Sequence, residues 1–206
     1  MAAMPDSDAA RLEREDHTYQ RSFRVSKAQM GMTVFLASLS VLFGASLVAM
    51  VLTRIGGAPW PDAELTELPR GLIISTVLMG ALSFVLHRAV SSVQRNRQRA
   101  LLSSLNWAVA LAVAFVLAQS LNWTEVASRD LGDQASTLFP FTFFFLTGLH
   151  ASHVVGGLVP LLVIRGRARQ QDYSSSRHEP VKLCAQYWHF LGVVWVVLGV
   201  ALYLMG

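Results

Sequence analysis

Five long stretches of the chain contain no charged side chain, and they set the pattern of the whole sequence. They cover residues 28–53, 71–87, 100–124, 134–164 and 183–206. Since about 20 mainly apolar residues cross a bilayer as a helix, four stretches are long enough, and snorkelling arginines can extend the second. Strands of a membrane barrel would be about ten residues long with alternating polarity. The pattern predicts an all-α, polytopic membrane protein, a bundle of five transmembrane helices.

The chain is expected to have two parts. Residues 1–27 form a polar segment without the apolar core that a cleavable secretory signal needs. Residues 28–206 form the five-helix transmembrane domain, in which the connecting loops are short. Within it, the spans are expected at about 28–53, 70–88, 101–122, 138–164 and 183–205.

Basic residues predict the orientation of this bundle. Of the 17 Lys and Arg residues, fourteen lie in the N-terminal segment and in the loops after the second and fourth spans, and the alternate loops hold only Arg54, Arg70 and Arg129. The positive-inside rule then places the N-terminus in the cytoplasm. The net charge of +4 is a consequence of topology, and no basic stripe with interleaved aromatic residues indicates a nucleic acid partner.

The polar residues inside the spans limit the possible functions. None of the five stretches contains Asp, Glu, Lys or Arg, so the intramembrane carboxylates that pumps and ion-coupled transporters commonly use are missing. A transporter is therefore a weaker hypothesis. The single cysteine, Cys184, excludes an internal disulfide and any metal site built on paired cysteines.

The fourth span carries a polar stripe. Thr147, His150, His153 and Gly157 recur at helical spacing on one face. Polar and small residues in an apolar helix are expected to face other helices. We therefore expect the two histidines to be hydrogen-bonded between packed helices.

The last span carries aromatic residues and a third histidine, His189. Tyr187 and Trp188 lie where an aromatic belt is expected, near the cytoplasmic headgroups. Trp195 follows Trp188 by seven residues and shares its face. Anchoring and packing are the favoured roles for these rings.

A small membrane enzyme with a histidine-bound metal is the alternative from another class. Two imidazoles three residues apart can hold one ion, but a site needs further ligands. Only His189 is available elsewhere within the spans, because His87 is expected at the end of the second span, beside Arg88. The packing interpretation is therefore favoured, and no metal, haem or catalytic residue is expected in this chain.

The motifs of the last two spans resemble subunit III of the haem-copper respiratory oxidases. The resemblance covers about residues 28–206, and five helices are typical of the short bacterial form, which lacks the first two of seven helices. Its packing residues here are Thr147, Gly148, His150, His153, Gly157, Tyr187, Trp188, His189 and Trp195.

The chain also departs from the family pattern. Leu39 stands where a glutamate usually follows the serine of the first motif, and Gly192 stands where an aspartate is common. Lys182 and Ala151 replace a glutamate and a glycine. The missing acids favour a scaffolding role over proton handling.

The resemblance implies an accessory, non-redox subunit of a cytochrome c oxidase in the bacterial inner membrane. Such a subunit is not catalytic by itself: haem and copper belong to partner chains, and it packs on subunit I within a complex that includes subunit II. It also binds phospholipid, for which Arg88, Arg95, Arg97 and Arg99 are candidate headgroup contacts beside their plain topological role. An accessory subunit of a quinol oxidase or of a nitric oxide reductase is the related alternative.

Overall fold

The computed structural model describes residues 27–57, 71–133 and 139–205. Every long element in these ranges is a helix: α2 (Lys27–Ile55), α3 (Gly71–Gln94), α4 (Gln98–Asp133), α5 (Phe139–Arg169) and α6 (Glu179–Met205). All five are long and apolar enough to cross a membrane. The predicted five-helix, all-α membrane architecture is confirmed. The segment 1–27 lies outside the described residues except for Lys27.

The chain forms two compact units, Met1–Phe35 and Leu36–Gly206. In the first, the described residues are the opening turns of α2, where the Thr33 hydroxyl donates to the carbonyl of Gln29. The second contains the remainder of α2 and the other four helices. It holds all the residues that were predicted to pack.

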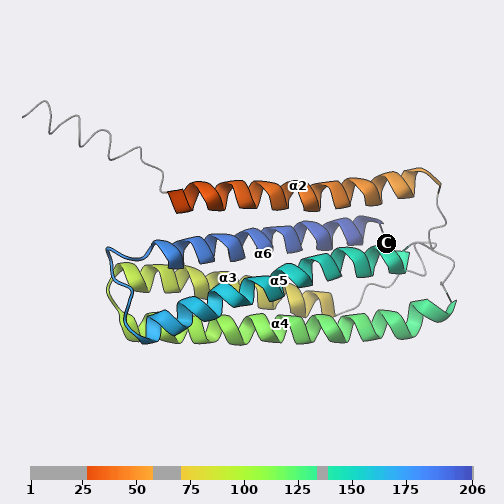
Figure 1. Ribbon diagram of the computed structural model, residues 1–206. Helices are drawn as coiled ribbons and strands as arrows, with labels where there is room; N and C mark the ends of the chain where they lie inside the picture. The colour runs from red at the N-terminus through yellow and green to blue at the C-terminus, as the bar shows by residue number, and fades with distance from the viewer. Residues whose placement is uncertain (1–26, 58–70, 134–138, 206) are drawn as a thin grey trace, which may run out of the picture. The chain divides into compact units, whose positions relative to one another are not determined.

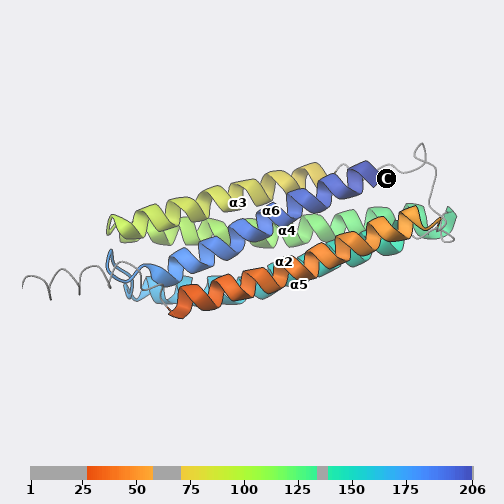
Figure 2. The same ribbon diagram turned by 90° about the horizontal axis from the view of Figure 1, so that it is seen from above.

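Helices α3 to α6 run alternately up and down in the second unit (Figure 1). Helix α3 packs on α4 and α6, and α5 packs on the same two helices, so the four form a closed ring of neighbours. Figure 2 shows the same helices from above, with α6 crossing beside α3. Each helix thus buries one face inside the ring and leaves the other apolar face outside, as a bilayer requires.

The helices are longer than the uncharged stretches that predicted them. Helix α3 continues past His87 to Gln94, and α4 continues past Thr124 to Asp133. A charged residue marks the end of the part of a helix that can lie in hydrocarbon. It does not end the helix itself, because Arg, Lys and Glu form helices well in water and among headgroups. His87 is therefore an exposed residue within α3 rather than a residue at a helix end.

The turns after α3 and α5 lie at the same end of the bundle and are hydrogen-bonded to each other (Figure 1). The Asn96 amide oxygen accepts from the backbone N–H of Ser175 at 2.7 Å, and its amide nitrogen donates to the Ser175 hydroxyl at 3.2 Å. Asn96 has a φ of 53°, a left-handed conformation that asparagine tolerates better than most residues. The side chain of Gln98 adds a bond to the carbonyl of Tyr173.

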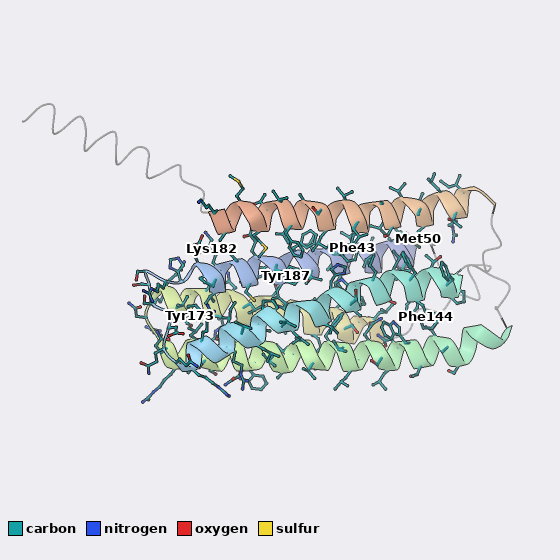
Figure 3. The ribbon with its side chains drawn as sticks, in the orientation of Figure 1. Phe43, Met50, Phe144, Tyr173, Lys182 and Tyr187 are labelled. Carbon is teal, nitrogen blue, oxygen red and sulfur yellow. The ribbon has the colours of Figure 1, made fainter. Side chains whose placement is uncertain are left out.

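Tyr173 also stabilises the connection between the two turns. Its side chain lies at this end of the bundle (Figure 3) and is buried. Burial raises the pKa of its phenol, while Arg167 opposes that shift. The phenol therefore stays neutral at physiological pH. The two arginine-rich turns are held as one rigid end of the bundle.

A hydrophobic cluster fills the opposite half of the bundle. Phe43 and Met50 of α2 contribute to it (Figure 3). Beside it, the amide nitrogen of Asn122 donates to the hydroxyl of Ser75 and to the side-chain oxygen of Gln119, each at 3.3 Å. A β-carbon at Gly71 would overlap the Asn122 side chain. The bond between Asn122 of α4 and Ser75 of α3 therefore fixes how the two helices are aligned along their length, which apolar contacts alone would not do.

Candidate functional site: the histidine and aromatic core

His150 lies at the centre of the bundle and is completely buried. Aromatic rings from three other helices surround its imidazole: Trp195 at 5.0 Å, Phe115 at 5.7 Å and Phe43 at 6.2 Å between ring centroids. Neither ring nitrogen makes a hydrogen bond among the described residues. The imidazole is therefore held by packing and by the weak attraction between its edge and the neighbouring rings.

The prediction that the two histidines are hydrogen-bonded between helices is wrong for both. His150 meets ring faces, which offer no conventional acceptor. His153 bonds through Nδ1 to the carbonyl of Leu149, 2.7 Å away in its own helix. Leu39, at the position where the resemblance leads one to expect a glutamate, is buried and apolar, one turn before Phe43.

Replacing His150 by an apolar ring tests this environment. A buried polar group without a partner costs about 1 to 3 kcal/mol, so we expect His150→Phe to leave the thermal stability of the assembled complex unchanged or raised. His189→Phe is the control and should lower it, because His189 has a partner on α3. Unfolding of the purified complex followed by heat would measure both. A loss of stability in His150→Phe equal to that in the control would contradict the packing role.

At Gly157, side chains of α6 pack directly against the backbone of α5. A β-carbon there would lie 2.6 Å from Cε1 of Tyr187 and 3.2 Å from Cζ2 of Trp188. The Tyr187 hydroxyl donates to the backbone carbonyl of His153 at 2.8 Å. Glycine is thus required for the two helices to meet. By contrast, a β-carbon at Gly44, Gly80, Gly148 or Gly156 would meet nothing within 4 Å.

Tyr187 and Trp188 are buried inside the bundle and do not form the expected belt toward the headgroups. Both residues keep their predicted position along the helix, but their side chains lie against Gly157 rather than outward. Sequence position gives the depth of a residue in the membrane and not the direction of its side chain around the helix. The favoured packing role applies to both.

Helices α3 and α6 are joined by two side-chain hydrogen bonds. Nδ1 of His189 bonds to the hydroxyl of Ser83, and the indole N–H of Trp195 donates to the hydroxyl of Thr76 at 3.2 Å. His189 and Trp195 of α6 were predicted as packing residues, but their partners Ser83 and Thr76 on α3 were not predicted. The spacing of seven residues between Thr76 and Ser83, which places both on one face of α3, was the available signal.

Thr147 ties α5 to α4. It accepts a hydrogen bond from the indole N–H of Trp123 at 3.0 Å and donates to the carbonyl of Phe143 at 2.6 Å. The predicted polar stripe of α5 therefore faces its neighbours: Thr147, His150 and Gly157 are buried and His153 is half-buried. Gly148, also predicted, is half-buried and makes no close approach.

The candidate lipid-binding arginines lie on the surface. Arg88, Arg95, Arg97 and Arg99 are all exposed, and the Arg88 guanidinium lies 6.0 Å from the centre of the Phe84 ring. The structure brings Arg99 into a shallow hollow on α4, and it leaves the other three outside. The hollow is lined by Arg99, Leu102, Ser103, Asn106, Trp107 and Ala110.

Arg165 of α5 completes the polar rim of this hollow. Its Nε donates to the side-chain oxygen of Asn106, so a second guanidinium is held next to a residue that lines the hollow. Neither Arg165 nor Trp107 was predicted as a lipid contact. The helical spacing from Arg99 to Ser103, Asn106 and Trp107 could have indicated a common face, but the approach of α5 cannot be derived from α4 alone.

The histidines of the spans were the candidate metal ligands. Across the described ranges, no group of three or more His, Cys, Asp or Glu side chains is arranged to hold an ion. Cys184 is buried as a free thiol. The arrangement of the polar residues serves contact between helices.

The fold and this core define a polytopic membrane subunit whose polar side chains fix the packing of its helices. A family model described as cytochrome c oxidase subunit III matches residues 14–206, and the chain belongs to that family. It is therefore a component of a haem-copper oxidase complex with other subunits.

Individual relatives agree with this assignment. The chain is 29% identical to cytochrome c oxidase subunit 3 of Synechocystis sp., over 85% of this chain and 74% of the relative. It is 28% identical to the same subunit of Thermostichus vulcanus, over 92% of both chains. A probable quinol oxidase subunit 3 of Staphylococcus saprophyticus is 25% identical over 91% of this chain and 93% of the relative.

Proposed function

We propose that this chain is the accessory, non-redox subunit III of a terminal oxidase, which stabilises subunit I and binds phospholipid. The observation that supports the role best is the engagement of the intramembrane histidines and tryptophans in packing around His150. In this role haem and copper would be held by partner chains. Oxygen reduction is then an activity of the complex.

Purification of the complex tests the proposal. A tag on this chain should bring down the haem- and copper-containing subunits I and II, and deletion of the chain should leave an oxidase that loses activity faster during turnover. A chain that purifies alone with its own haem or metal would contradict the proposal.

The electron donor defines a second candidate function. The likeness to a probable quinol oxidase subunit 3 supports a quinol-oxidising complex, and an accessory subunit of a nitric oxide reductase is the further alternative. The purified complex should be assayed with reduced cytochrome c, with a quinol and with nitric oxide. The donor and acceptor that sustain turnover decide among the three.

The bundle is proposed to lie in the bacterial plasma membrane with its N-terminus in the cytoplasm. The arginine-rich turns after α3 and α5 share one end of the bundle, which is the arrangement that the positive-inside rule favours. A protease-sensitive tag at the N-terminus should therefore be cleaved in inverted membrane vesicles and protected in intact cells. Cleavage in intact cells would reverse the orientation.

The hollow beside Arg99 is the proposed site for an anionic phospholipid. Arg99 would face the phosphate, Arg165 is held at the Asn106 side of the hollow, and the exposed Trp107 adds an amphipathic ring to the lining. We expect the variant with Arg99→Gln and Arg165→Gln to lose one anionic lipid from the purified complex, as measured by native mass spectrometry.

The matched control removes two charges elsewhere on the same surface. Arg95→Gln with Arg97→Gln changes the net charge equally and leaves the hollow intact. This control should retain the lipid. Equal loss from both variants would show that only the total charge attracts lipid, and the site would be rejected.

A further inference from the structure

A polar seam runs along the outside of the bundle where α3 meets α6. On α3, Thr76, Gly80, Ser83 and His87 recur at helical spacing on one edge. On α6, His189 bonds to Ser83 across the seam. The residues of this α3–α6 seam therefore form a continuous strip of hydroxyl, imidazole and small side chains on a surface that is otherwise apolar.

Part of the seam lacks hydrogen-bond partners. His87 and Gln186 are both exposed, and neither side chain makes a hydrogen bond to any residue that the structure describes. His189 is half-buried and uses only Nδ1, which leaves Nε2 free to bond outward. His87 and His189 are close enough for their charges to interact. Several polar atoms thus point away from the chain at one place.

Ser83 and His189 lie deep enough for their polar atoms to be costly in lipid, whereas His87 lies next to the charged boundary at Arg88. Arg88 and Lys182 mark the charged boundary of the two helices, and Ser83 and His189 lie five and seven residues further into the spans. At about 1.5 Å per residue this is about 7 to 10 Å below that boundary. Acyl chains there offer no hydrogen-bond acceptor, so polar side chains at this depth are expected to meet protein.

The same place has room for a helix to approach. A β-carbon at Gly80 would meet nothing within 4 Å, and one at Gly192 would meet only the Met79 side chain, 3.8 Å away. Small residues beside polar ones are the usual composition of a contact between membrane helices.

The charge of the seam indicates the chemistry of the partner. Its titratable groups are imidazoles, and Arg88 and Lys182 lie at the charged ends of the same two spans. A carboxylate is therefore the complementary group. A second copy of this chain could not supply one at the depth of His189, because its five uncharged stretches contain no acid. We propose that the α3–α6 seam docks a transmembrane helix of another oxidase subunit, which presents an Asp or Glu side chain to His87 and His189.

This proposal rests on the proposed packing of the chain within the oxidase, and cross-linking in the intact complex tests it. A photoreactive benzoyl-phenylalanine at position 87 should form a protein adduct with another subunit, and the cross-linked peptide should contain Asp or Glu within one helical turn. The same group at position 107, on the exposed lipid-facing side of α4, is the control and should label lipid.

A pair of substitutions adds an energetic test in the same complex. His87→Leu removes the hydrogen-bond donor and should reduce the amount of this chain retained after detergent washing about tenfold, the effect of losing one charge-assisted bond. His87→Gln keeps a donor and should retain most of it. Equal retention in both variants would overturn the proposal.

The outcomes separate this proposal from the proposed function. Adducts with lipid alone, or with a second copy of this chain, would overturn the docking site while the chain still purifies with the oxidase. Failure of the unmodified chain to purify with any oxidase subunit would instead overturn the function itself.

Discussion

Gly157→Val is expected to prevent stable incorporation of this subunit. Even the first added carbon would lie 2.6 Å from Cε1 of Tyr187, so α5 and α6 would have to separate or the buried rings of Tyr187 and Trp188 would have to move. Overpacking of this kind typically costs about 1 to 3 kcal/mol, and a branched side chain against two rigid rings belongs at the upper end. The measurement is the ratio of this chain to the other subunits in the purified complex.

Gly156→Val provides the matched control for this expectation. It adds the same side chain one residue earlier on the same helix, where a β-carbon meets nothing within 4 Å. The control should incorporate normally. If both variants incorporate equally, the close approach at Gly157 is not a requirement of the fold.

Trp195→Ala is expected to have the second large effect. The Trp195 ring is 2% exposed and contacts both Phe115 and His150, with ring centroids 5.0 Å apart in each case. Its loss leaves a cavity in the centre of the bundle and removes the hydrogen bond that its indole N–H donates to the Thr76 hydroxyl. Truncation of a buried tryptophan costs about 3 to 5 kcal/mol, which should appear as a lower temperature of subunit dissociation on heating the complex.

Trp107→Ala separates this packing effect from the general loss of an indole. Trp107 is 63% exposed, so its removal leaves no cavity inside the ring of helices and should leave the dissociation temperature within a few degrees of the unmodified complex. Trp195→Phe should fall between the two alanine variants, because it retains a ring and loses the bond to Thr76. A Trp195→Ala complex as stable as the Trp107→Ala complex would refute the central role of this side chain.

The number and type of helices followed from a physical constraint that acts on every residue. Charged side chains are excluded from hydrocarbon, so uncharged stretches locate the spans with little ambiguity. The ends were less predictable, because nothing in the constraint stops a helix at a charge, and α4 accordingly continues past Glu125 to Asp133. The inward direction of Thr147, His150 and Gly157 also followed, since periodicity fixes which residues share a face.

The residues of other helices that pack against a given helix face could not be predicted in the same way. The neighbours of His150 come from α2, α4 and α6, and no local pattern indicates that all three would present aromatic rings there. The prediction that His150 is hydrogen-bonded between helices was wrong for the same reason. Periodicity along one helix carries no information about the rotation and tilt of the next, so partners such as Ser83 and Arg165 emerged only from the assembled bundle.

The bond between Asn96 and Ser175 has a consequence for the order of folding during synthesis. The two residues are 79 positions apart, and at about 5 to 20 residues per second a ribosome needs about 4 to 16 seconds to cover that distance. Throughout this interval the hairpin of α3 and α4 must remain inserted without its link to the second hairpin. Its arginine-rich turn, its own contacts, including those of Asn122 with Ser75, and the basic segment before the first span then hold its orientation. Errors in topology are therefore expected to originate in this hairpin, before α5 and α6 have left the ribosome.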